Sequence, residues 1–283
     1  MKKLSRRQVL GYGSLAAVGA LVGEAFTEPN RLESIEVTVP IKNLPRPFEG
    51  FKIGMMSDLH WGHNIDARFV DHAYQLLAFH NPDILVVAGD IYHAQEQTAA
   101  MAPSLQGVFD QFHAPLGIFG VLGNHDHKIG KDFVVQQVQT YTPIKLIDNS
   151  GLLLTRNGES LALGGVGDLW EDKVELHKAF VDVPDSTPRI LISHNPDIAE
   201  SIPEDNKTRV DLQISGHTHG GQMVLPGIYN PYSRISQYGS KFNRGFVQGK
   251  RHRVFVSKGL ARLNHMRFCA LPDVACITLT TAS

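Results

Sequence analysis

The sequence predicts an α/β fold built around one sizeable hydrophobic core. Short apolar segments rich in β-branched residues alternate with segments of helical periodicity, which is typical of helices packed against strands. The second half of the chain adds more strand candidates and favours a layered core with two sheets. A chain of 283 residues with 42% hydrophobic content can bury such a core, and its 19% of charged residues exclude a disordered protein.

Residues 1–25 are expected to be an export signal, followed by a domain that spans residues 26–283. The segment MKKLSRRQVL is basic, and an uncharged Gly/Ala/Leu/Val stretch follows it. SRRQVL resembles the twin-arginine signal of bacteria, although Val9 stands where Phe is usual and Gly11 where Lys is frequent. The alternatives are an ordinary secretory signal and an uncleaved anchor. We therefore expect an export translocase as a partner and a location in the periplasm or at the outer face of the membrane or cell wall.

The charge balance argues against nucleic acid as a partner. The formal net charge is −1, and removing residues 1–25, with four basic residues and one acidic residue, takes it to −4. No basic tract with interleaved aromatic residues is present in the sequence. An anionic substrate would need a local positive site, such as bound metal ions.

Five short apolar segments predict buried strands, and each is followed by a polar residue. They are FKIGMMS before Asp58, DILVVAG before Asp90, GIFGVLG before Asn124, RILIS before His194 and DLQIS before Gly216. Further strands are expected at 32–39, 152–155, 161–164, 253–257 and 274–280.

Helices are expected between some of these strands. Asp66 is suited to cap a helix that continues to about His80, and Pro82 prevents its continuation. Weaker helical patterns cover residues 98–112, 131–140 and 171–181.

Two other segments have a distinct composition. Residues 222–245 are rich in Gly, Pro, Ser and Tyr and predict a long irregular loop. Its tyrosines, Tyr229, Tyr232 and Tyr238, suggest a cover over an apolar or sugar moiety, and the alternative is a plain surface excursion. The only two cysteines, Cys269 and Cys276, exclude a disulfide framework and favour two buried free thiols over a disulfide between them.

The polar residues after the five strands predict a metal site. In open α/β sheets ligands bind beyond the carboxyl ends of the strands, so these residues should converge. His60 follows Asp58 by two positions, and His219 follows His217 in the same way, so each pair can face one ion from an extended chain. The carboxylate of Asp90 could bridge two ions, while Asn124 and His194 offer an amide oxygen and an imidazole. The pattern predicts a binuclear centre.

In this order the motifs SDLHWG, AGD, GNHD, SHNPD and SGHTHGGQ resemble the calcineurin-like metallophosphoesterase superfamily. The later segments LPG and SKGL…RF…LPD…ITL are similar to a bacterial membrane-associated subgroup. That subgroup includes twin-arginine-exported members and UDP-2,3-diacylglucosamine pyrophosphatases. The resemblance covers nearly all of the chain after residue 25, and it implies a four-layer fold of two packed mixed sheets flanked by helices.

The resemblance also implies a ligand set. One ion would be held by Asp58, His60, Asp90 and His219. The second would be held by Asp90, Asn124, His194 and His217, with Asp90 bridging. His125 would lie over the substrate, with Asp126 either orienting its imidazole or only closing the turn. Purple acid phosphatases carry a Tyr three residues after the bridging Asp; here that residue is His93, and Tyr92 precedes it, so an iron–tyrosinate site is not expected.

Residues outside this ligand set are weaker candidates. Arg262, His265 and Arg267 lie in the family-like C-terminal segment and could line the substrate pocket, and the alternative for Arg267 is a surface residue or a structural ion pair. His63, His93 and His127 are expected either to support the ligands or to face the substrate. The remaining histidines, His72, His80, His113, His177 and His252, are interpreted as structural or surface residues.

These residues predict a hydrolase that acts on phosphoric esters. Carboxylate, amide and imidazole ligands without thiolates suit two divalent ions of Mn, Fe, Zn or Co. A hydroxide formed between the ions would attack phosphorus, and His125 would stabilise or protonate the leaving oxygen. The expected substrate is a phosphodiester of a cell-envelope or lipid-linked molecule, with a membrane surface as a further partner. The alternatives are a UDP-2,3-diacylglucosamine pyrophosphatase, which needs a cytoplasm-facing domain, and a non-catalytic metal-stabilised binding protein of the envelope.

Overall fold

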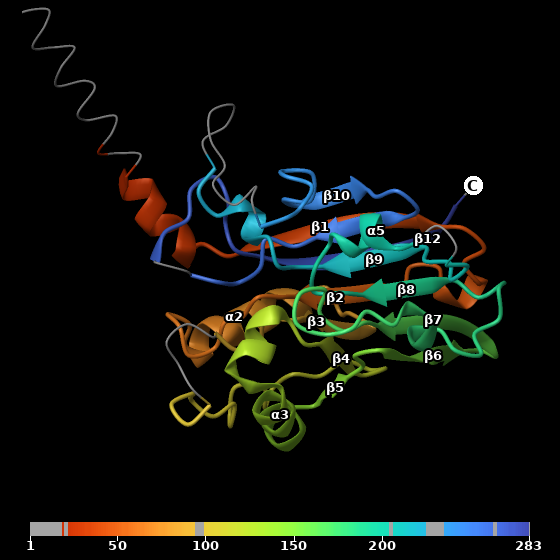
Figure 1. Cartoon of the computed structure of the whole chain (residues 1–283), viewed down its shortest axis with the longest axis horizontal. Helices are drawn as coiled ribbons and strands as arrows, with labels where there is room; N and C mark the ends of the chain where they lie inside the picture. Colours follow the sequence, from red (N-terminus) through yellow and green to blue (C-terminus); the bar gives the residue numbers. More distant parts are fainter. Residues whose placement is uncertain are drawn as a thin grey trace, which may run out of the picture.

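Two six-stranded mixed β-sheets form the centre of the protein (Figure 1). The computed structural model describes residues 19, 22–93, 99–203, 206–224, 235–262 and 265–282. Most of the expected export signal, and Tyr229 and Tyr232 of the expected loop, lie outside these residues. Within the described part of the chain, no helix has the length and apolar character needed to cross a membrane.

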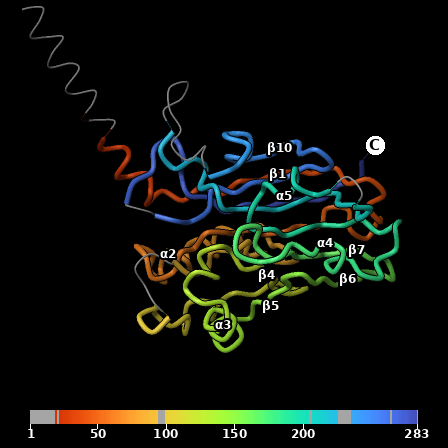
Figure 2. The backbone as a smooth tube through the Cα atoms, in the orientation of Figure 1, coloured from red at the N-terminus to blue at the C-terminus, as the bar shows by residue number. Residues whose placement is uncertain are grey.

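The first sheet has the strand order β1-β12-β2-β3-β4-β5. Strands β2 to β5 are parallel, β12 is antiparallel to β2, and β1 is parallel to β12. The first and last strands of the domain therefore run side by side (Figure 2). The strands are β1 (Glu33–Ile41), β2 (Lys52–Met56), β3 (Ile84–Ala88), β4 (Ile118–Val121), β5 (Ile144–Leu146) and β12 (Asp273–Thr281).

The second sheet has the order β10-β11-β9-β8-β7-β6. Its four inner strands are parallel, and both edge strands are antiparallel to their neighbours. The strands are β6 (Ser150–Arg156), β7 (Glu159–Gly165), β8 (Arg189–Ile192), β9 (Leu212–Ser215), β10 (Gly245–Gln248) and β11 (Arg253–Val256). These bounds confirm the strands expected from the apolar segments of the second half.

Helices cover the outer face of each sheet, which makes four layers. On the first sheet lie α2 (Ala67–Ala78) and α3 (Asn124–Tyr141), and their apolar residues pack with those of β2, β3 and β4. On the second sheet lie the short helices α4 (Leu176–Ala179) and α5 (Ile198–Ser201). A separate apolar cluster fills the space between the sheets, with side chains such as Ile53, Val86 and Ile192. The predicted four-layer α/β fold is confirmed.

Local sequence explains where the main helices begin. Asp66 caps α2 as expected, because its Oδ1 accepts the backbone N–H of Phe69 at 2.9 Å. The expected helix 131–140 begins earlier, at Asn124, and is broken at Gly130, where φ is 128°. The remaining short elements are the 3₁₀ turns η1 (Glu28–Asn30), η2 (Arg46–Phe48) and η3 (His219–Gly221).

Two helix predictions were wrong. Residues 99–112 form turns instead of a helix, with Leu105, Phe109 and Phe112 buried against the first sheet. Pro103 removes a helical hydrogen bond there, and Gly107 adopts a left-handed φ of 80°. The predicted helix 171–181 is reduced to the single turn of α4, and turns precede it. The two cysteines, predicted to be buried free thiols, are both free, but only Cys276 is buried, whereas Cys269 is partly exposed.

Candidate metal centre

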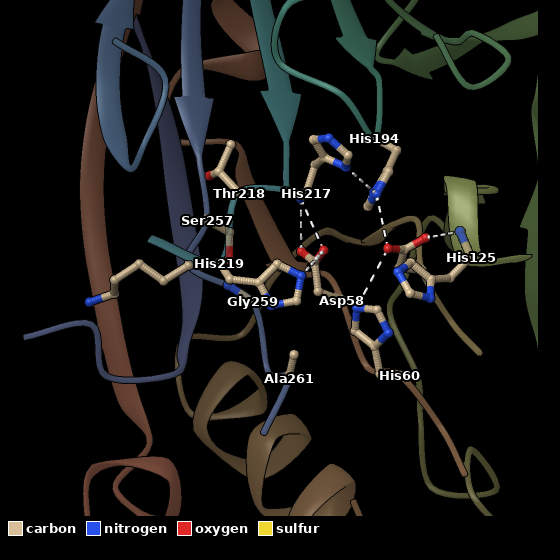
Figure 3. A network of polar contacts seen from close by, with 12 residues as sticks. Asp58, His60, His125, His194, His217, Thr218, His219, Ser257, Gly259 and Ala261 are labelled. Carbon is tan, nitrogen blue, oxygen red and sulfur yellow. Dashed lines mark hydrogen bonds and ion pairs between the residues drawn. The ribbon is translucent and has the colours of Figure 1, made fainter. Parts of the chain in front are cut away.

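The polar residues expected to converge do lie together, at the carboxyl ends of the inner strands of both sheets. Asp58 and His60 follow β2, Asp90 follows β3, and Asn124 opens α3 after β4. From the second sheet, His194 follows β8, and His217 and His219 follow β9. Figure 3 shows the imidazoles of these histidines grouped around the carboxylate of Asp58. All seven side chains are buried.

Four of these residues form a tight cluster. Asp58, His60, Asp90 and His219 each bring one ligand atom within 4.8 Å of the others. Asp58 Oδ1 lies 3.4 Å from His219 Nε2, and Asp90 Oδ2 lies 3.5 Å from His60 Nε2. These are the residues that the sequence resemblance implied for one ion, and such a set could hold a divalent metal.

A second group lies on the other side of Asp90. His194 Nε2 is 3.2 Å from Asp90 Oδ2 and 3.2 Å from His217 Nδ1. The Nδ1 atom of His194 lies 2.8 Å from the carbonyl oxygen of Ala88, which accepts its proton, so that Nε2 carries the lone pair whenever the imidazole is neutral. Asn124 is buried nearby at the start of α3. Asp90 therefore joins the two groups through one carboxylate.

The backbone at these residues is unusual. Asp58, His60, Asp90, His217 and His219 all have left-handed φ values between 49° and 74°. Non-glycine residues rarely adopt this conformation, and such residues concentrate at functional sites, where the surrounding fold offsets the cost. The left-handed bends direct these side chains away from the strands and towards one point.

Two glycines let the carboxylates approach other segments closely. A Cβ atom at Gly123 would overlap Asp90 Oδ1, and one at Gly216 would overlap Asp58 Oδ2. At Gly216 the space is used by hydrogen bonds, because the backbone N–H of His217 donates to both oxygens of Asp58, at 3.0 and 3.1 Å. Any larger residue at either position would displace a carboxylate.

Burial controls the charge of these side chains. Burial lowers the pKa values of His60, His217 and His219 well below the ordinary value, so these imidazoles are neutral, the form that binds metal. Burial also opposes charge on His194, but the Asp90 carboxylate outweighs it and raises the pKa of His194 well above the ordinary value. Burial raises the pKa of Asp58 to about 6.

The unsatisfied atoms fit a bound metal. His60 Nε2, Asn124 Oδ1, His217 Nε2 and His219 Nδ1 are buried and have no hydrogen-bond partner among the described residues. Within the same part of the chain, no lysine or arginine forms an ion pair with Asp58 or Asp90. Buried carboxylates and lone pairs are costly unless a cation or donor compensates them. Divalent ions would satisfy both groups at once, so the donor set fits them.

His125 lies at the edge of the cluster and is only partly buried. Its ring meets that of His60 edge to face, with centroids 4.6 Å apart, and its backbone N–H donates to Asp90 Oδ1 at 2.8 Å. Burial lowers the pKa of His125.

Asp126 does not have the role that sequence reasoning preferred. Its Oδ2 accepts the backbone N–H groups of Ile91 and Gly123, and its Oδ1 accepts that of Tyr92. The carboxylate thus ties the loop after β3 to the start of α3. The alternative, a residue that closes the turn, matches this geometry.

Further histidines extend from the centre. His93 Nδ1 lies 2.9 Å from His60 Nδ1, and its ring stacks on His125 with centroids 5.0 Å apart. The ring of His63 lies 4.1 Å from that of His93. His127 Nε2 is 3.9 Å from Asp172 Oδ2 and lies farther along α3. Of these three histidines, His93 is the one for which the structure shows a direct contact with a ligand, His60.

The three C-terminal candidates for substrate binding, Arg262, His265 and Arg267, lie in different environments. Arg267 is fully buried, and its guanidinium donates to the carbonyl oxygens of Lys258, Gly259, Ala261 and Ala270 at 2.8–3.0 Å. A guanidinium bound in this way holds the backbone together and does not reach a substrate, so the expectation for Arg267 was wrong.

Arg262 and His265 do not share the buried position of Arg267. The guanidinium of Arg262 lies over the ring of Phe69 on α2, 3.7 Å from its centroid. His265 is exposed, with a left-handed φ of 52°. Near Arg262, a cavity of about 460 Å³ is lined by residues 61, 62, 64–67 and 103.

Sequence reasoning missed the loop after β7. Asp168 is 1% exposed, and its Oδ2 has no hydrogen-bond partner among the described residues. Trp170 lies against the ring of His217, with centroids 4.4 Å apart. The sequence contained one signal for this loop, its position: GDLW follows a predicted strand, as the ligand motifs do.

Residues 51–221, which contain all seven candidate ligands, match the calcineurin-like phosphoesterase family. The chain belongs to this family. As a calcineurin-like phosphoesterase it is a hydrolase of phosphoric esters, and the His/Asp cluster could hold the divalent ions that phosphatases with two-metal sites use.

Three curated relatives are similar along most of their length. The uncharacterized metallophosphoesterase YkuE of Bacillus subtilis is 29% identical, with 100% of each chain covered. The UDP-2,3-diacylglucosamine pyrophosphatase LpxG of Chlamydia trachomatis is 26% identical, over 87% of this chain and 89% of LpxG. The phosphodiesterase YaeI of Escherichia coli is 26% identical, over 81% of this chain and 82% of YaeI.

Proposed function

We propose that this phosphoesterase hydrolyses a phosphodiester of a cell-envelope or lipid-linked molecule. One observation carries the proposal: Asp90 joins two groups of buried histidines, with Oδ2 at 3.5 Å from His60 Nε2 and 3.2 Å from His194 Nε2. The similarity to YaeI, which is named a phosphodiesterase, supports a diester substrate.

The proposed ligands form two sets that share Asp90. Asp58, His60, Asp90 and His219 would hold one divalent ion. Asp90, Asn124, His194 and His217 would hold the other. When bound, two ions of Mn, Fe, Zn or Co would supply Lewis acidity, neutralise phosphate charge and lower the pKa of water.

His125 is assigned to the leaving oxygen. The ring lies beside His60 at the partly open edge of the cluster, and Asp90 fixes the backbone at this position through the His125 N–H. Burial lowers the pKa of His125, so its imidazole is held mainly in the neutral form, which would stabilise the leaving oxygen by donating its ring N–H. Asp126 contributes by holding the loop on which His125 lies.

A second candidate function is the cleavage of UDP-2,3-diacylglucosamine. The similarity to LpxG over 87% of this chain favours it. This reaction would place the catalytic domain on the cytoplasmic side, whereas the SRRQVL segment supports export. Fractionation of cells that produce the full chain and an Arg6→Lys/Arg7→Lys variant separates the two functions. Export predicts the parent in the envelope fraction and the variant in the cytoplasm.

The activity is tested on two small esters, bis-p-nitrophenyl phosphate and p-nitrophenyl phosphate, with manganese-loaded full-length protein. We expect faster cleavage of the diester. Asp90→Asn should lose activity together with bound metal. His125→Ala should lower turnover by about 100-fold or more while keeping its metal.

Each arm has a contrary result. Faster cleavage of the monoester would contradict the proposed phosphodiesterase activity and indicate a phosphomonoesterase. Metal loss in His125→Ala would make His125 a ligand, and full metal content without turnover on any ester would favour the envelope binding protein.

A further inference from the structure

Trp170 is a large aromatic side chain that remains 42% exposed beside the metal centre. Its indole meets the imidazole of His217 with an interplanar angle of 83° and centroids 4.4 Å apart. Trp170 follows β7, so it comes from the same edge of the second sheet as His194 and His217. A group esterified to a phosphate at the centre would lie within reach of the indole.

The loop that carries Trp170 is held by its own hydrogen bonds. Asp168 Oδ1 accepts the backbone N–H groups of Trp170 and Glu171, at 2.9 and 3.0 Å. The side chain of Asn149 accepts from the backbone N–H groups of Gly167 and Glu175 and so closes the base of the loop. Hydrogen bonds therefore hold the backbone both before and after Trp170.

Ion pairs also tie this loop to α3. Lys131 Nζ lies 2.7 Å from Asp172 Oδ2, and Lys128 Nζ lies 3.5 Å from Glu171 Oε1. An exposed indole on a loop anchored in this way is positioned before a ligand arrives. Binding against it would cost little ordering of the protein.

We propose that Trp170 forms a subsite for a ring, either a nucleobase or a sugar, carried by the reacting phosphate. The inference rests on the proposed phosphodiesterase function and names its substrate class: a phosphodiester in which one esterified group is a nucleoside or a glycosyl unit. An indole stacks on the flat face of a base or the apolar face of a sugar. An open-chain alcohol such as glycerol has no such face and gains less.

Intrinsic fluorescence gives a direct test, because the chain has two tryptophans and Trp61→Phe leaves Trp170 as the sole indole. Zinc-loaded Trp61→Phe protein is titrated with uridine 5′-monophosphate, glucose 1-phosphate, glycerol 3-phosphate and inorganic phosphate. We expect a ring-bearing ester to change the Trp170 emission and to bind roughly tenfold more tightly than glycerol 3-phosphate. The tighter of the two ring esters identifies the ring as base or sugar.

Trp170→Ala and Trp170→Phe provide the matched comparison, with affinities measured by competitive inhibition of ester hydrolysis. Trp170→Ala should weaken binding of the ring ester roughly tenfold and leave the affinity for inorganic phosphate unchanged, while Trp170→Phe keeps most of the binding. Equal binding of ring and glycerol esters by the parent chain would overturn the subsite. An equal loss of phosphate affinity in Trp170→Ala would also overturn it. Failure of the metal-loaded parent to bind phosphate at all would instead overturn the proposed function, and the subsite with it.

Discussion

The Nδ1 atoms of His60 and His93 lie 2.9 Å apart in the buried centre of the protein. His60 Nε2 faces Asp90, so metal binding through Nε2 requires the proton of His60 to be on Nδ1, donated to His93. His93 would then act as a positioning residue that sets the tautomer and the orientation of a ligand. It stands where purple acid phosphatases have a tyrosine, so this chain uses the position differently.

Replacing His93 should weaken metal binding. We expect His93→Ala to lower the affinity for divalent metal by about 10–100-fold, because His60 loses the acceptor for its Nδ1 proton. His93→Asn offers an oxygen near the original nitrogen and should restore most of the affinity. Isothermal titration of the metal-free protein with zinc measures both. Equal affinities for the alanine variant and the parent would show that His60 needs no partner.

Gly216→Ala should displace Asp58. The added Cβ would overlap Asp58 Oδ2, and the conflict is purely steric because Gly216 is not among the positive-φ residues. We expect a reduced metal content by elemental analysis and a loss of about 1–3 kcal/mol in the free energy of unfolding. Full metal content in Gly216→Ala would mean that the carboxylate can move without leaving the centre.

Arg267→Ala should destabilise the fold. The substitution leaves four buried carbonyl oxygens without their charged donor, at an expected cost of about 3 kcal/mol or more. Arg262→Ala, which removes a cation–π contact with Phe69 and a charge interaction with Asp66, should cost about 0.5–1 kcal/mol. Denaturant unfolding of the metal-free proteins makes the comparison. An Arg267→Ala chain of parental stability with weakened substrate binding would restore the substrate role expected from the sequence.

His252 should make the protein less stable in acid. The residue is 5% exposed, its Nε2 lies 2.8 Å from Gln213 Oε1, and burial lowers its pKa to about 4. A histidine in the unfolded chain has a pKa of about 6.5. Burial of neutral His252 therefore stabilises the folded state fully above that pH, and this contribution is lost as the pH falls towards about 4. The loss should reach roughly 3 kcal/mol at most.

His252→Gln keeps a donor for Gln213 and removes the titration. Unfolding free energies of the parent and the variant are compared across this pH range in the presence of a chelator, because metal ligands also titrate there. The difference between the two curves isolates His252. Parallel curves would show that His252 is already free to take up a proton in the folded state.

Much of the fold and of the ligand set was predictable because the signals are local. The alternation of apolar runs with helical patterns follows from side-chain direction within each element, and parallel strands bring their carboxyl ends to one edge. Asp58, His60, Asp90, Asn124, His194, His217 and His219 all follow such strands, and the structure brings them together. The helix predicted at 98–112 failed because apolar spacing alone does not register the breaks at Pro103 and Gly107.

The sequence by itself determined the strands, the layers and the kinds of ligand atom that meet at their ends, since these depend on short-range periodicity. Only the tertiary structure decided which polar groups face each other across long separations in the chain. It placed Arg267 among backbone carbonyls, Asp126 on the N–H groups of a distant loop, and Trp170 against His217. The physical reason is that burial and hydrogen-bond satisfaction are properties of the packed molecule, and a side chain's role changes with the partners that packing provides.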